Sequence, residues 1–376
     1  MNKKFLAGIS FIISFGIMSG ANAFSPSIPL NTLQVAQEAM KKEVTEKTYQ
    51  SEIIRVGIGN QSFGNYNYKT IGIYATAPLE IYENGASVTK VGANVNVNVA
   101  INPDMTYVLT DDTGKETAKI NGIIKFTTTG GCLGVKGLKR AGKPALYHGY
   151  FEIMPSDNGN FNLVNKIPVE VYLRGVVPNE MPVSFGLEAL KAQSVAARNY
   201  VLSPRTKASP NYDVVDSVAS QVYFGANTEK ELSNRAVEET EGLVALYNWE
   251  LILAQYSSTA GGYTESYSNA FSDPKSGAFP SAEKPYLVAK PDMLSQGSLK
   301  EEEDAAAFYK SRPNSMDIRS PYYRWEREWT LNELKVVLET NLPAQSSTGF
   351  VKPAFSKGDM LGEIEEIKVK KRGDSG

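Results

Sequence analysis

Residues 176–200 read V-V-P-N-E-M-P-V-S-F-G-L-E-A-L-K-A-Q-S-V-A-A-R-N-Y, and this stretch decides how the middle of the chain folds. Its second half predicts a helix over residues 187–202, because apolar residues recur there at a spacing that places them on one helical face. Lys191 and Arg198 are seven residues apart, so they share another face of the same helix. The expected buried stripe consists of Leu187, Leu190, Ala197 and Val201.

A single carboxylate, Glu180, stands between Pro178 and Pro182 just before this helix. Because proline fixes its own backbone and restricts the residue before it, a stiff segment sets the position of the Glu180 side chain. The spacing leaves two interpretations open. Glu180 is a catalytic acid/base with the cations Lys191 and Arg198 behind it, or it leads the following helix, whose N-terminal dipole favours a negative charge. In the second interpretation both cations are solvated charges of a helix face.

The composition removes most other kinds of catalytic site. The sequence has one histidine, His148, and one cysteine, Cys132, so metal sites that need several of these residues are excluded. A thiol mechanism would have to use this pair. Both residues lie in a β-rich region, and we interpret each as a packing or turn residue. Chemistry in this chain therefore rests on carboxylates, hydroxyls, Lys and Arg.

The N-terminus has the pattern of a secretory signal peptide over residues 1–23. Lys3 and Lys4 precede an apolar run over residues 5–18, and the small residues Ala21 and Ala23 offer a cleavage site. The run is shorter than the roughly 20 residues of a membrane-spanning helix, and an uncleaved anchor is the alternative interpretation. We therefore expect a secreted, extracytoplasmic protein of the cell wall or periplasm, with no integral membrane span after cleavage.

The charge balance limits the partners. Lys and Arg total 39 and Asp and Glu total 41, so no basic field exists to attract nucleic acid or an anionic membrane. The 20 tyrosines suit stacking on apolar faces such as sugar rings, or packing within strands. A neutral or mildly charged partner fits this composition best.

The pattern of helix-forming and strand-forming residues changes along the chain. The fold class that this pattern predicts is α+β. Residues 24–50 predict a helical leader, and residues 51–164 predict a β-rich domain. From residue 165 to residue 376 the pattern is mixed. Strands are expected over 54–58, 95–99, 123–126, 243–247 and 251–257, and a further helix, capped by Asn227 or Thr228, is expected to stop at Gly242.

Two later segments lie outside these elements. The residues Ser257 to Gly262, S-S-T-A-G-G, are a tight turn or a place where a ligand approaches the backbone closely. Near the C-terminus, Ile364, Ile367 and Val369 predict a strand that ends in the sequence R-G-D-S-G. That strand would be half of a hairpin and would leave an unpaired edge. We interpret the Arg-Gly-Asp triplet as a coincidence.

Five sequence segments together resemble the stage II sporulation protein D family. The resemblance covers roughly residue 165 to the end, and its most specific motif is E-A-L-K-A-Q-S-V-A-A-R in the predicted helix. The segments are residues 170–200, residues 216–225 (D-S-V-A-S-Q-V-Y-F-G), Ala236-Val237 with Thr240 and Gly242, residues 256–265 (Y-S-S-T-A-G-G-Y-T-E) and residues 320–325 (S-P-Y-Y-R-W).

Members of that family are secreted or membrane-anchored lytic transglycosylases, which act on peptidoglycan glycan strands and prefer strands without stem peptides. The resemblance implies that Glu180 is the catalytic acid/base and that Lys191 and Arg198 line the glycan groove. It also implies one cleft shared by Glu180, both cations and the loop that begins at Ser257. The substrate-binding residues implied in this way are Lys191, Arg198, Tyr223, Tyr256, Ser257, Ser258, Thr259 and Gly262.

A single carboxylic acid suits this chemistry. Protonated Glu180 would donate to the oxygen between N-acetylmuramic acid and N-acetylglucosamine, and its carboxylate would then take the proton of the muramoyl 6-hydroxyl. Closure of that hydroxyl onto C1 gives a 1,6-anhydro product without water. A hydrolase would normally need a second carboxylate, and Glu188 and Asp216 stay open as such a partner.

The chain departs from the family pattern at three places. Ser257 replaces a histidine of many relatives, and Val215, Ala219 and Ser220 replace residues that supply zinc ligands in some of them. We therefore predict no zinc and no other cofactor. Relatives continue for some tens of residues beyond the position of Gly376, so we expect a C-terminally truncated domain.

The sequence leaves three functional interpretations. The first is the lytic transglycosylase, which retention of Glu180 favours. The second is a non-catalytic wall-binding protein that enhances an N-acetylmuramoyl-L-alanine amidase, which the missing loop histidine and the short tail favour. The third is a structural protein of the wall machinery whose β-rich part docks a partner. The partners in these interpretations are peptidoglycan glycan strands and, for the second, an amidase.

Overall fold

The computed structural model describes residues 52–203, 209–273, 276–292, 297–346 and 349–376. The chain forms two compact units, one that ends at Gln255 and one that begins at Tyr256. The predicted signal peptide and the predicted helical leader lie outside the described residues. No helix in the described ranges is long and apolar enough to cross a bilayer.

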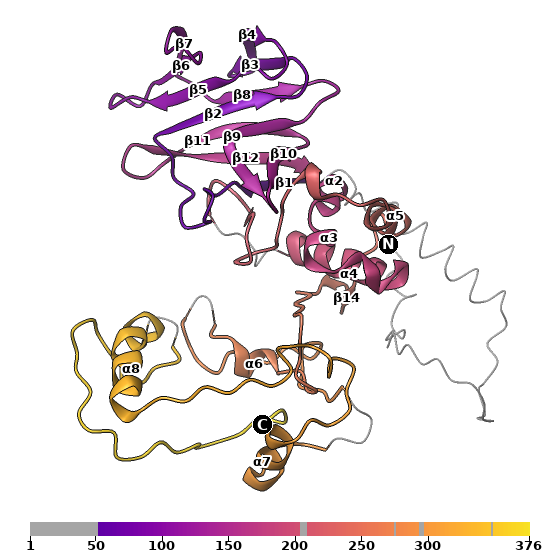
Figure 1. Ribbon diagram of the computed structural model, residues 1–376, viewed down its shortest axis with the longest axis vertical. Coiled ribbons are helices and arrows are strands. Elements are labelled where there is room, and N and C mark those ends of the chain that lie inside the picture. The colour runs from indigo at the N-terminus through magenta and orange to yellow at the C-terminus, as the bar shows by residue number, and fades with distance from the viewer. Residues whose placement is uncertain (1–51, 204–208, 274–275, 293–296, 347–348) are drawn as a thin grey trace, which may run out of the picture. The chain divides into compact units, whose positions relative to one another are not determined.

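The β-rich part of the first unit consists of two largely antiparallel sheets (Figure 1). The larger sheet has the order β13-β1-β12-β11-β8-β3-β4, and the smaller has the order β10-β9-β2-β5-β6-β7. Their strands are β1 Ile53–Gly57, β2 Thr70–Ala75, β3 Leu79–Glu83, β4 Ala86–Val91, β5 Val97–Ile101, β6 Tyr107–Thr110, β7 Glu116–Ile120, β8 Ile124–Thr128, β9 Leu133–Arg140, β10 Lys143–Tyr147, β11 Tyr150–Ser156, β12 Asn160–Pro168 and β13 Val214–Val215.

Alternation of side chains explains why these segments pack as half-buried strands. In β2, Ile71, Ile73 and Ala75 are buried and the residues between them are not. In β8 and β11, Phe126 and Phe151 are fully buried and are register partners across the sheet. The three strands predicted before residue 165 are confirmed as β1, β5 and β8, each with ends shifted by one or two residues.

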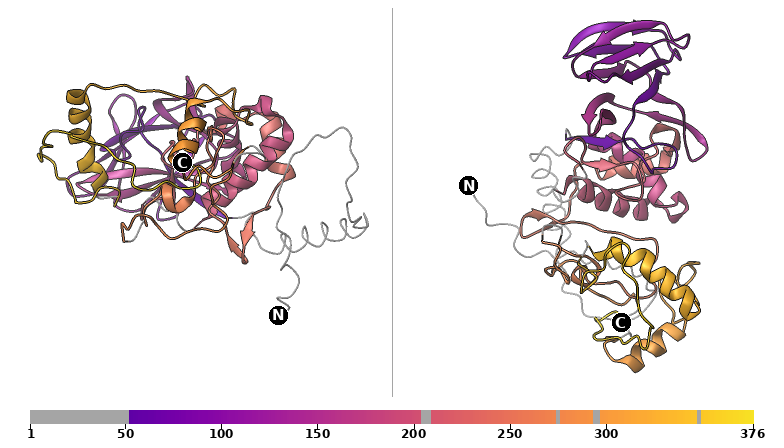
Figure 2. Two further views of the ribbon diagram at one scale, coloured as in Figure 1. Left: turned by 90° about the horizontal axis from the view of Figure 1, so that it is seen from below. Right: turned by 90° about the vertical axis from the view of Figure 1, so that its left-hand side faces the viewer.

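The helices of the first unit continue directly from β12 and gather at one end of the β-structure (Figure 2). The predicted helix over 187–202 is confirmed at both ends as α4, and it begins after Gly186, whose φ of 89° ends the preceding turn. The helical elements are α2 Val169–Arg174, α3 Val177–Glu180, η2 Val183–Phe185, α4 Leu187–Leu202, η4 Ala226–Thr228 and α5 Glu231–Glu239.

The β-rich part and these helices share one hydrophobic core. β13 returns after α4 and pairs in parallel with β1, with Val214 opposite Val56, and so ties the segment after α4 to the larger sheet. Core residues of the helices, such as Leu190 and Ala197, belong to the same buried cluster as Phe126 of the sheet. The predicted domain boundary between residues 164 and 165 falls within β12.

Two sequence-based boundaries near the end of the first unit differ from the structure. The second predicted helix begins later, at Glu231, because the one-turn helix η4 takes up the expected cap residues. The two strands predicted over 243–247 and 251–257 are shorter in the structure and pair as a hairpin, β14 Leu246–Tyr247 with β15 Glu250–Leu251. Its turn residues Asn248 and Trp249 have φ of 49° and 67°, the backbone that a two-residue hairpin of the primed type requires.

The second unit contains α6 Tyr267–Ala270, α7 Glu302–Lys310 and α8 Leu331–Ser346, with a small core of Leu299, Ala305 and Phe308. The strand predicted through Ile364 and Val369 is wrong, because the described residues after α8 form no strand. Instead the tail is held by polar contacts: Arg372 pairs with Glu302 at 2.6 Å, and the amide of Leu299 donates to the carbonyl of Asp374 at 2.8 Å.

Candidate active site

Glu180 is the last residue of α3, and its carboxylate is held by one hydrogen bond. The amide of Val222, in the loop after β13, donates to Glu180 Oε1 at 2.6 Å. The other carboxylate oxygen has no protein partner within the described residues. Glu180 does not cap α4, because the N-cap position is Gly186 and no side chain bonds to it. The structure therefore does not support the interpretation of Glu180 as the lead of that helix.

The surroundings of Glu180 favour its neutral form. Burial raises the pKa of Glu180, and the hydrogen bond from the Val222 amide opposes that rise. No Lys or Arg of the described ranges pairs with this carboxylate. Tyr200 of α4 is a near neighbour of Glu180. Burial raises the pKa of the Tyr200 phenol, and the charge of Glu180 raises it further. A half-buried carboxyl group without a cation beside it keeps its proton to higher pH than free glutamate, as a general acid requires.

The two cations predicted to line a groove occupy different surroundings. Arg198 is fully buried and forms a bidentate pair with Glu170 of α2, with Nε–Oε1 at 2.8 Å and Nη2–Oε2 at 2.6 Å. Its Nη1 donates to the carbonyl of Leu243 at 3.0 Å. Each of the three guanidinium nitrogens thus donates to a group of the protein. Arg198 therefore does not line a groove in this structure, and it joins α4 to α2.

Lys191 faces α5. Its ammonium pairs with Glu239 of α5 at 2.6 Å and with Glu188 at 2.8 Å. Tyr200, which neighbours Glu180, is nine residues further along α4 and so lies on the opposite side of that helix. The structure does not bring Lys191 together with Glu180.

Tyr223 is also a core residue. It is 1% exposed, its hydroxyl donates to Asn165 Oδ1 at 2.8 Å, and its ring packs 4.9 Å from that of Tyr172 and 5.6 Å from that of Tyr147. This position next to Val222 fixes the loop that reaches Glu180, and it leaves no ring face for a sugar.

The predicted substrate-binding residues Tyr256, Ser257, Ser258, Thr259 and Gly262 belong to the second unit. Asp317 organises their loop. The amides of Ala260 and Gly261 both donate to Asp317 Oδ2 at 2.7 Å, and the hydroxyls of Thr259 and Ser320 lie 2.5 Å apart. Gly262 has φ of 92°, and a Cβ there would come within 2.9 Å of the Tyr323 hydroxyl. The shared cleft with Glu180 stays a prediction.

Comparison with known proteins identifies the segment that contains Glu180. Residues 157–247 match the family model described as Stage II sporulation protein. By this segment the chain resembles the stage II sporulation protein D family. The match includes α2 to α5 and the loop that carries Val222, so the elements around Glu180 are those of the family.

Curated relatives agree with this family. The protein named Amidase enhancer of Bacillus subtilis (strain 168) is 47% identical over 120 residues, which are 32% of this chain and 15% of that protein. The Stage II sporulation protein D of the same organism is 30% identical over 202 residues, half of each protein. An uncharacterised protein of Brachyspira hyodysenteriae is 35% identical over 127 residues, about a third of each. The chain thus matches half or less of the length of each relative.

Two further carboxylates were open as partners of Glu180 in this sporulation-protein segment. Asp216 is fully buried, and both of its oxygens are occupied: Oδ1 accepts from the amide of Gly59 at 3.0 Å and Oδ2 from Arg140 at 2.7 Å. It cannot activate a water molecule there. Glu188 is exposed and pairs with Lys191.

Cys132 and His148, which we interpreted as separate packing or turn residues, come together. Cys132 Sγ lies 3.6 Å from His148 Nδ1, and His148 Nε2 lies 3.0 Å from Glu229 Oε1. The backbone amide of Cys132 donates to Thr76 Oγ1 at 2.9 Å, so it is not free to stabilise an oxyanion at this thiol. No spacing rule predicts this meeting, since Glu229 is 81 residues from His148.

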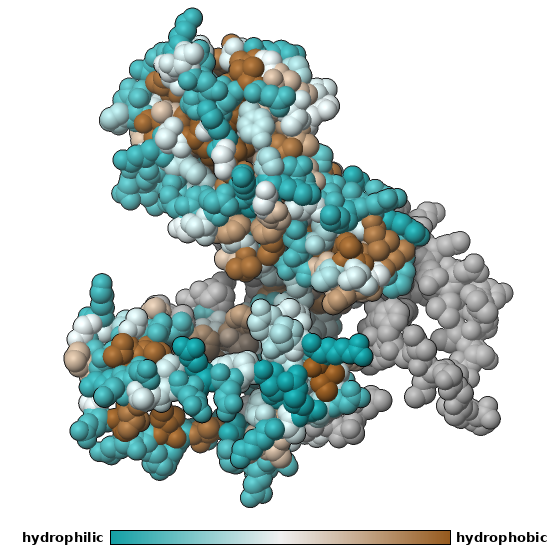
Figure 3. Space-filling model, in the orientation of Figure 1, coloured by the Kyte–Doolittle hydropathy of each residue, from teal (hydrophilic) through white to brown (hydrophobic). Residues whose placement is uncertain are grey.

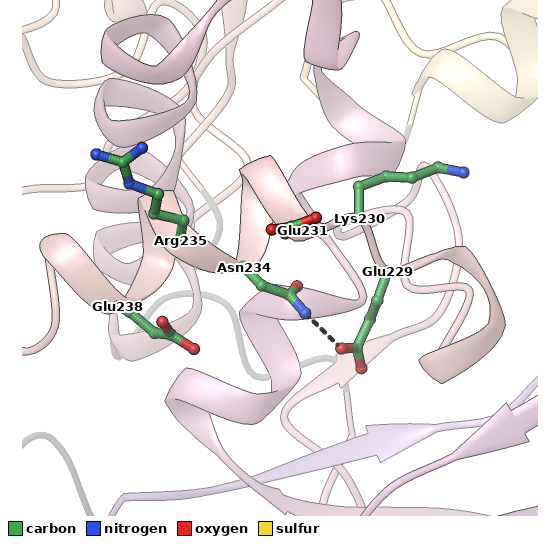
Figure 4. Close-up of a pocket in the computed structure, with 6 residues that line it drawn as sticks. All are labelled: Glu229, Lys230, Glu231, Asn234, Arg235 and Glu238. Carbon is green, nitrogen blue, oxygen red and sulfur yellow. Dashed lines mark hydrogen bonds between the residues drawn. The ribbon is translucent and has the colours of Figure 1, made fainter.

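Glu229 also lines an open, highly charged pocket of about 580 Å³ beside α5 (Figure 4). Figure 4 shows the Asn234 amide directed at Glu229, to which it donates at 2.9 Å. The pocket does not include Glu180. Its lining consists of Glu229, Lys230, Glu231, Asn234, Arg235 and Glu238.

The contacts of His148 predict a contribution to stability that depends on pH. Contacts with Cys132 and then Glu229 raise the pKa of His148 from 6.5 to about 10. A raised folded-state pKa stabilises the fold below the unfolded pKa, and this contribution is lost as pH rises from 6.5 to about 10. We expect the melting temperature of the wild type to fall across this window relative to a His148→Gln variant. The effect should be modest, because the side chain is 39% exposed. Parallel melting curves of the two proteins would contradict this assignment.

Proposed function

We propose that this protein is a secreted peptidoglycan lytic transglycosylase with Glu180 as its single acid/base. It cleaves the bond between N-acetylmuramic acid and N-acetylglucosamine in glycan strands, preferably those without stem peptides, and it acts in wall remodelling of the sporulation type. The observation that carries this proposal is the state of Glu180: half-buried, held through one oxygen by the Val222 amide, and with no cation beside it. The family supports a role at the cell wall.

The reaction uses Glu180 twice. As an acid it protonates the glycosidic oxygen, so that the N-acetylglucosamine hydroxyl leaves while positive charge develops at C1 of the muramoyl residue. As a carboxylate it then accepts the proton of the muramoyl 6-hydroxyl, whose oxygen bonds to C1. The bond broken is replaced by an internal ether, and no water is consumed. A second carboxylate is not required, which agrees with the occupied oxygens of Asp216.

The binding of the glycan needs apolar surface near the acid. Two segments near Glu180 each expose an apolar side chain. Phe185, in η2 just after Glu180, is 65% exposed, and Val218, in the loop that carries Val222, is 87% exposed. Figure 3 shows apolar patches among polar surface over the helical end of the first unit. Faces of pyranose rings pack on such side chains. In the proposed enzyme these residues contact sugar rings, whereas Arg198 and Tyr223 hold the elements that carry Glu180.

The experiment that tests the class of reaction follows the oxygen atoms. Glycan strands stripped of stem peptides are incubated with the protein in H₂¹⁸O, and the products are weighed by mass spectrometry. A lytic transglycosylase gives muramoyl ends that lack the elements of water and carry no ¹⁸O. Reducing ends with one ¹⁸O would show hydrolysis and would contradict the proposal.

A second candidate function has its own supporting observation. The 47% identity with the protein named Amidase enhancer favours a glycan-binding role that assists an amidase. The test adds a purified N-acetylmuramoyl-L-alanine amidase to intact peptidoglycan with wild type or Glu180→Gln protein. Equal stimulation of amidase by both proteins, without anhydro products, would favour the enhancer. Stimulation that needs Glu180 would favour the enzyme.

A further inference from the structure

A buried ion pair links the β-rich part of the first unit to the loop that holds Glu180. Arg140, at the end of β9, donates from Nη2 to Asp216 Oδ2 at 2.7 Å and from Nε at 3.2 Å. The two side chains are 2% and 0% exposed. Arg140 also donates to the carbonyl of Gly59 at 2.8 Å, and the amide of Gly59 donates back to Asp216 at 3.0 Å. The first residue of the loop after β13 is thus fixed by β9 and by the segment after β1.

The same loop is held at two further points by residues of the β-rich part. The Tyr66 hydroxyl donates to Ser217 Oγ at 3.0 Å. Phe63 stacks on Phe224 with ring centroids 6.2 Å apart, and the Arg140 guanidinium lies 4.1 Å from the centroid of the Phe63 ring. Arg140 therefore contacts Asp216 at the start of the loop, and it also contacts Phe63, which packs on Phe224 near the end of the loop.

Val222 lies between these anchors. Its amide is the one protein donor to Glu180 within the described residues, at 2.6 Å from Oε1. A shift of the loop relative to α3 would lengthen or bend this bond. The loop also meets the helical part directly, because the Phe224 amide donates to the Gly175 carbonyl and the Tyr172 hydroxyl donates to Gln221 Oε1, each at 3.2 Å, so the anchors from the β-rich part act together with these contacts. The direction of the Glu180 carboxylate thus depends on contacts made some distance away.

We propose that Arg140 is a positioning residue for Glu180, acting through Asp216, Phe63 and the Val222 amide. This makes the β-rich part of the unit a functional support of the active site. The catalytic meaning of the inference rests on the proposed function of Glu180, whereas the physical link does not. Groups other than Glu180 also titrate near this path: Tyr200, which faces it from α4, Asp216, whose pKa burial raises to about 6, and Tyr66 on Ser217, whose pKa burial also raises.

The test measures Glu180 itself. The protein is labelled with ¹³C at glutamate carboxyl carbons, the Glu180 signal is assigned by its loss in Glu180→Gln, and its titration is followed in wild type and Arg140→Met. We expect the titration midpoint to move upward in Arg140→Met, because the hydrogen bond from Val222 that lowers it is loosened. In the cleavage assay kcat should fall about 10- to 100-fold with KM nearly unchanged, and Arg140→Lys should recover part of this loss.

Arg55 offers a matched control. It pairs with Asp213 of the same chain segment at 2.7 Å, but on the other side of β13 from the loop. Arg55→Met should leave the Glu180 titration and the pH profile unchanged. If Arg140→Met does not fold, Phe63→Leu removes the aromatic contact without touching the ion pair, and the same upward shift is expected. An unchanged Glu180 signal in folded Arg140→Met or in Phe63→Leu would overturn the inference. A shift without any cleavage activity in the wild type would instead refute the proposed function.

Discussion

Replacing Arg198 by methionine should lower the free energy of unfolding by about 3–5 kcal/mol, the range for breaking a buried ion pair by removing one partner. The loss comes from Glu170, which would stay buried with its charge uncompensated. Glu170 Oε1 also accepts from the amide of Gly242 at 3.1 Å, so this carboxylate cannot easily turn toward water. Denaturant unfolding followed by circular dichroism measures the change.

Two variants control this prediction. Lys191→Met removes a cation from the same face of α4, but this ammonium is at the surface and should contribute little. The double variant Arg198→Met with Glu170→Gln removes both charges and keeps an acceptor for Gly242, so it should recover much of the lost stability. Equal effects of Arg198→Met and Lys191→Met would mean that the Arg198 pair does not hold α4 against α2.

The contrast between these two cations marks how far the sequence predicts this structure. Helical periodicity correctly predicted α4 and placed Lys191 and Arg198 on one face, because that pattern is local. Periodicity does not say what covers a face. Glu170 is 28 residues before Arg198 in the chain. Only the packing of α2 on α4 buries Arg198 in an ion pair and leaves Lys191 at the surface.

Long-range contacts explain the other differences. The loop that reaches Glu180 is placed by Arg140 and Phe63, which come from the β-rich part and carry no local signal for this role. The tail at Ile364 has the composition of a strand, but a strand needs a partner, and here polar contacts of Arg372 and Asp374 hold the chain instead. The resemblance to the family supplied the candidate role of Glu180, which composition and spacing left open.

Glu180→Gln is the substitution with the largest expected effect on activity. Glutamine has nearly the same shape and keeps an oxygen that accepts from the Val222 amide, so the fold and the loop should be preserved. It cannot give or take the proton of the reaction. General acid–base catalysis contributes about 10²- to 10⁴-fold, and since Glu180 serves as both acid and base we expect a loss of at least this size in kcat. Binding of glycan strands should change little.

The central claim is tested most directly by counting 1,6-anhydro-muramoyl ends made from stem-peptide-free glycan strands by wild type, Glu180→Gln and Glu188→Gln. Glu188 is the matched control, an exposed glutamate paired with Lys191 at the start of α4. The account predicts equal product from wild type and Glu188→Gln, and a loss of about 100-fold or more in Glu180→Gln with glycan binding retained. Equal product from Glu180→Gln and wild type would contradict it.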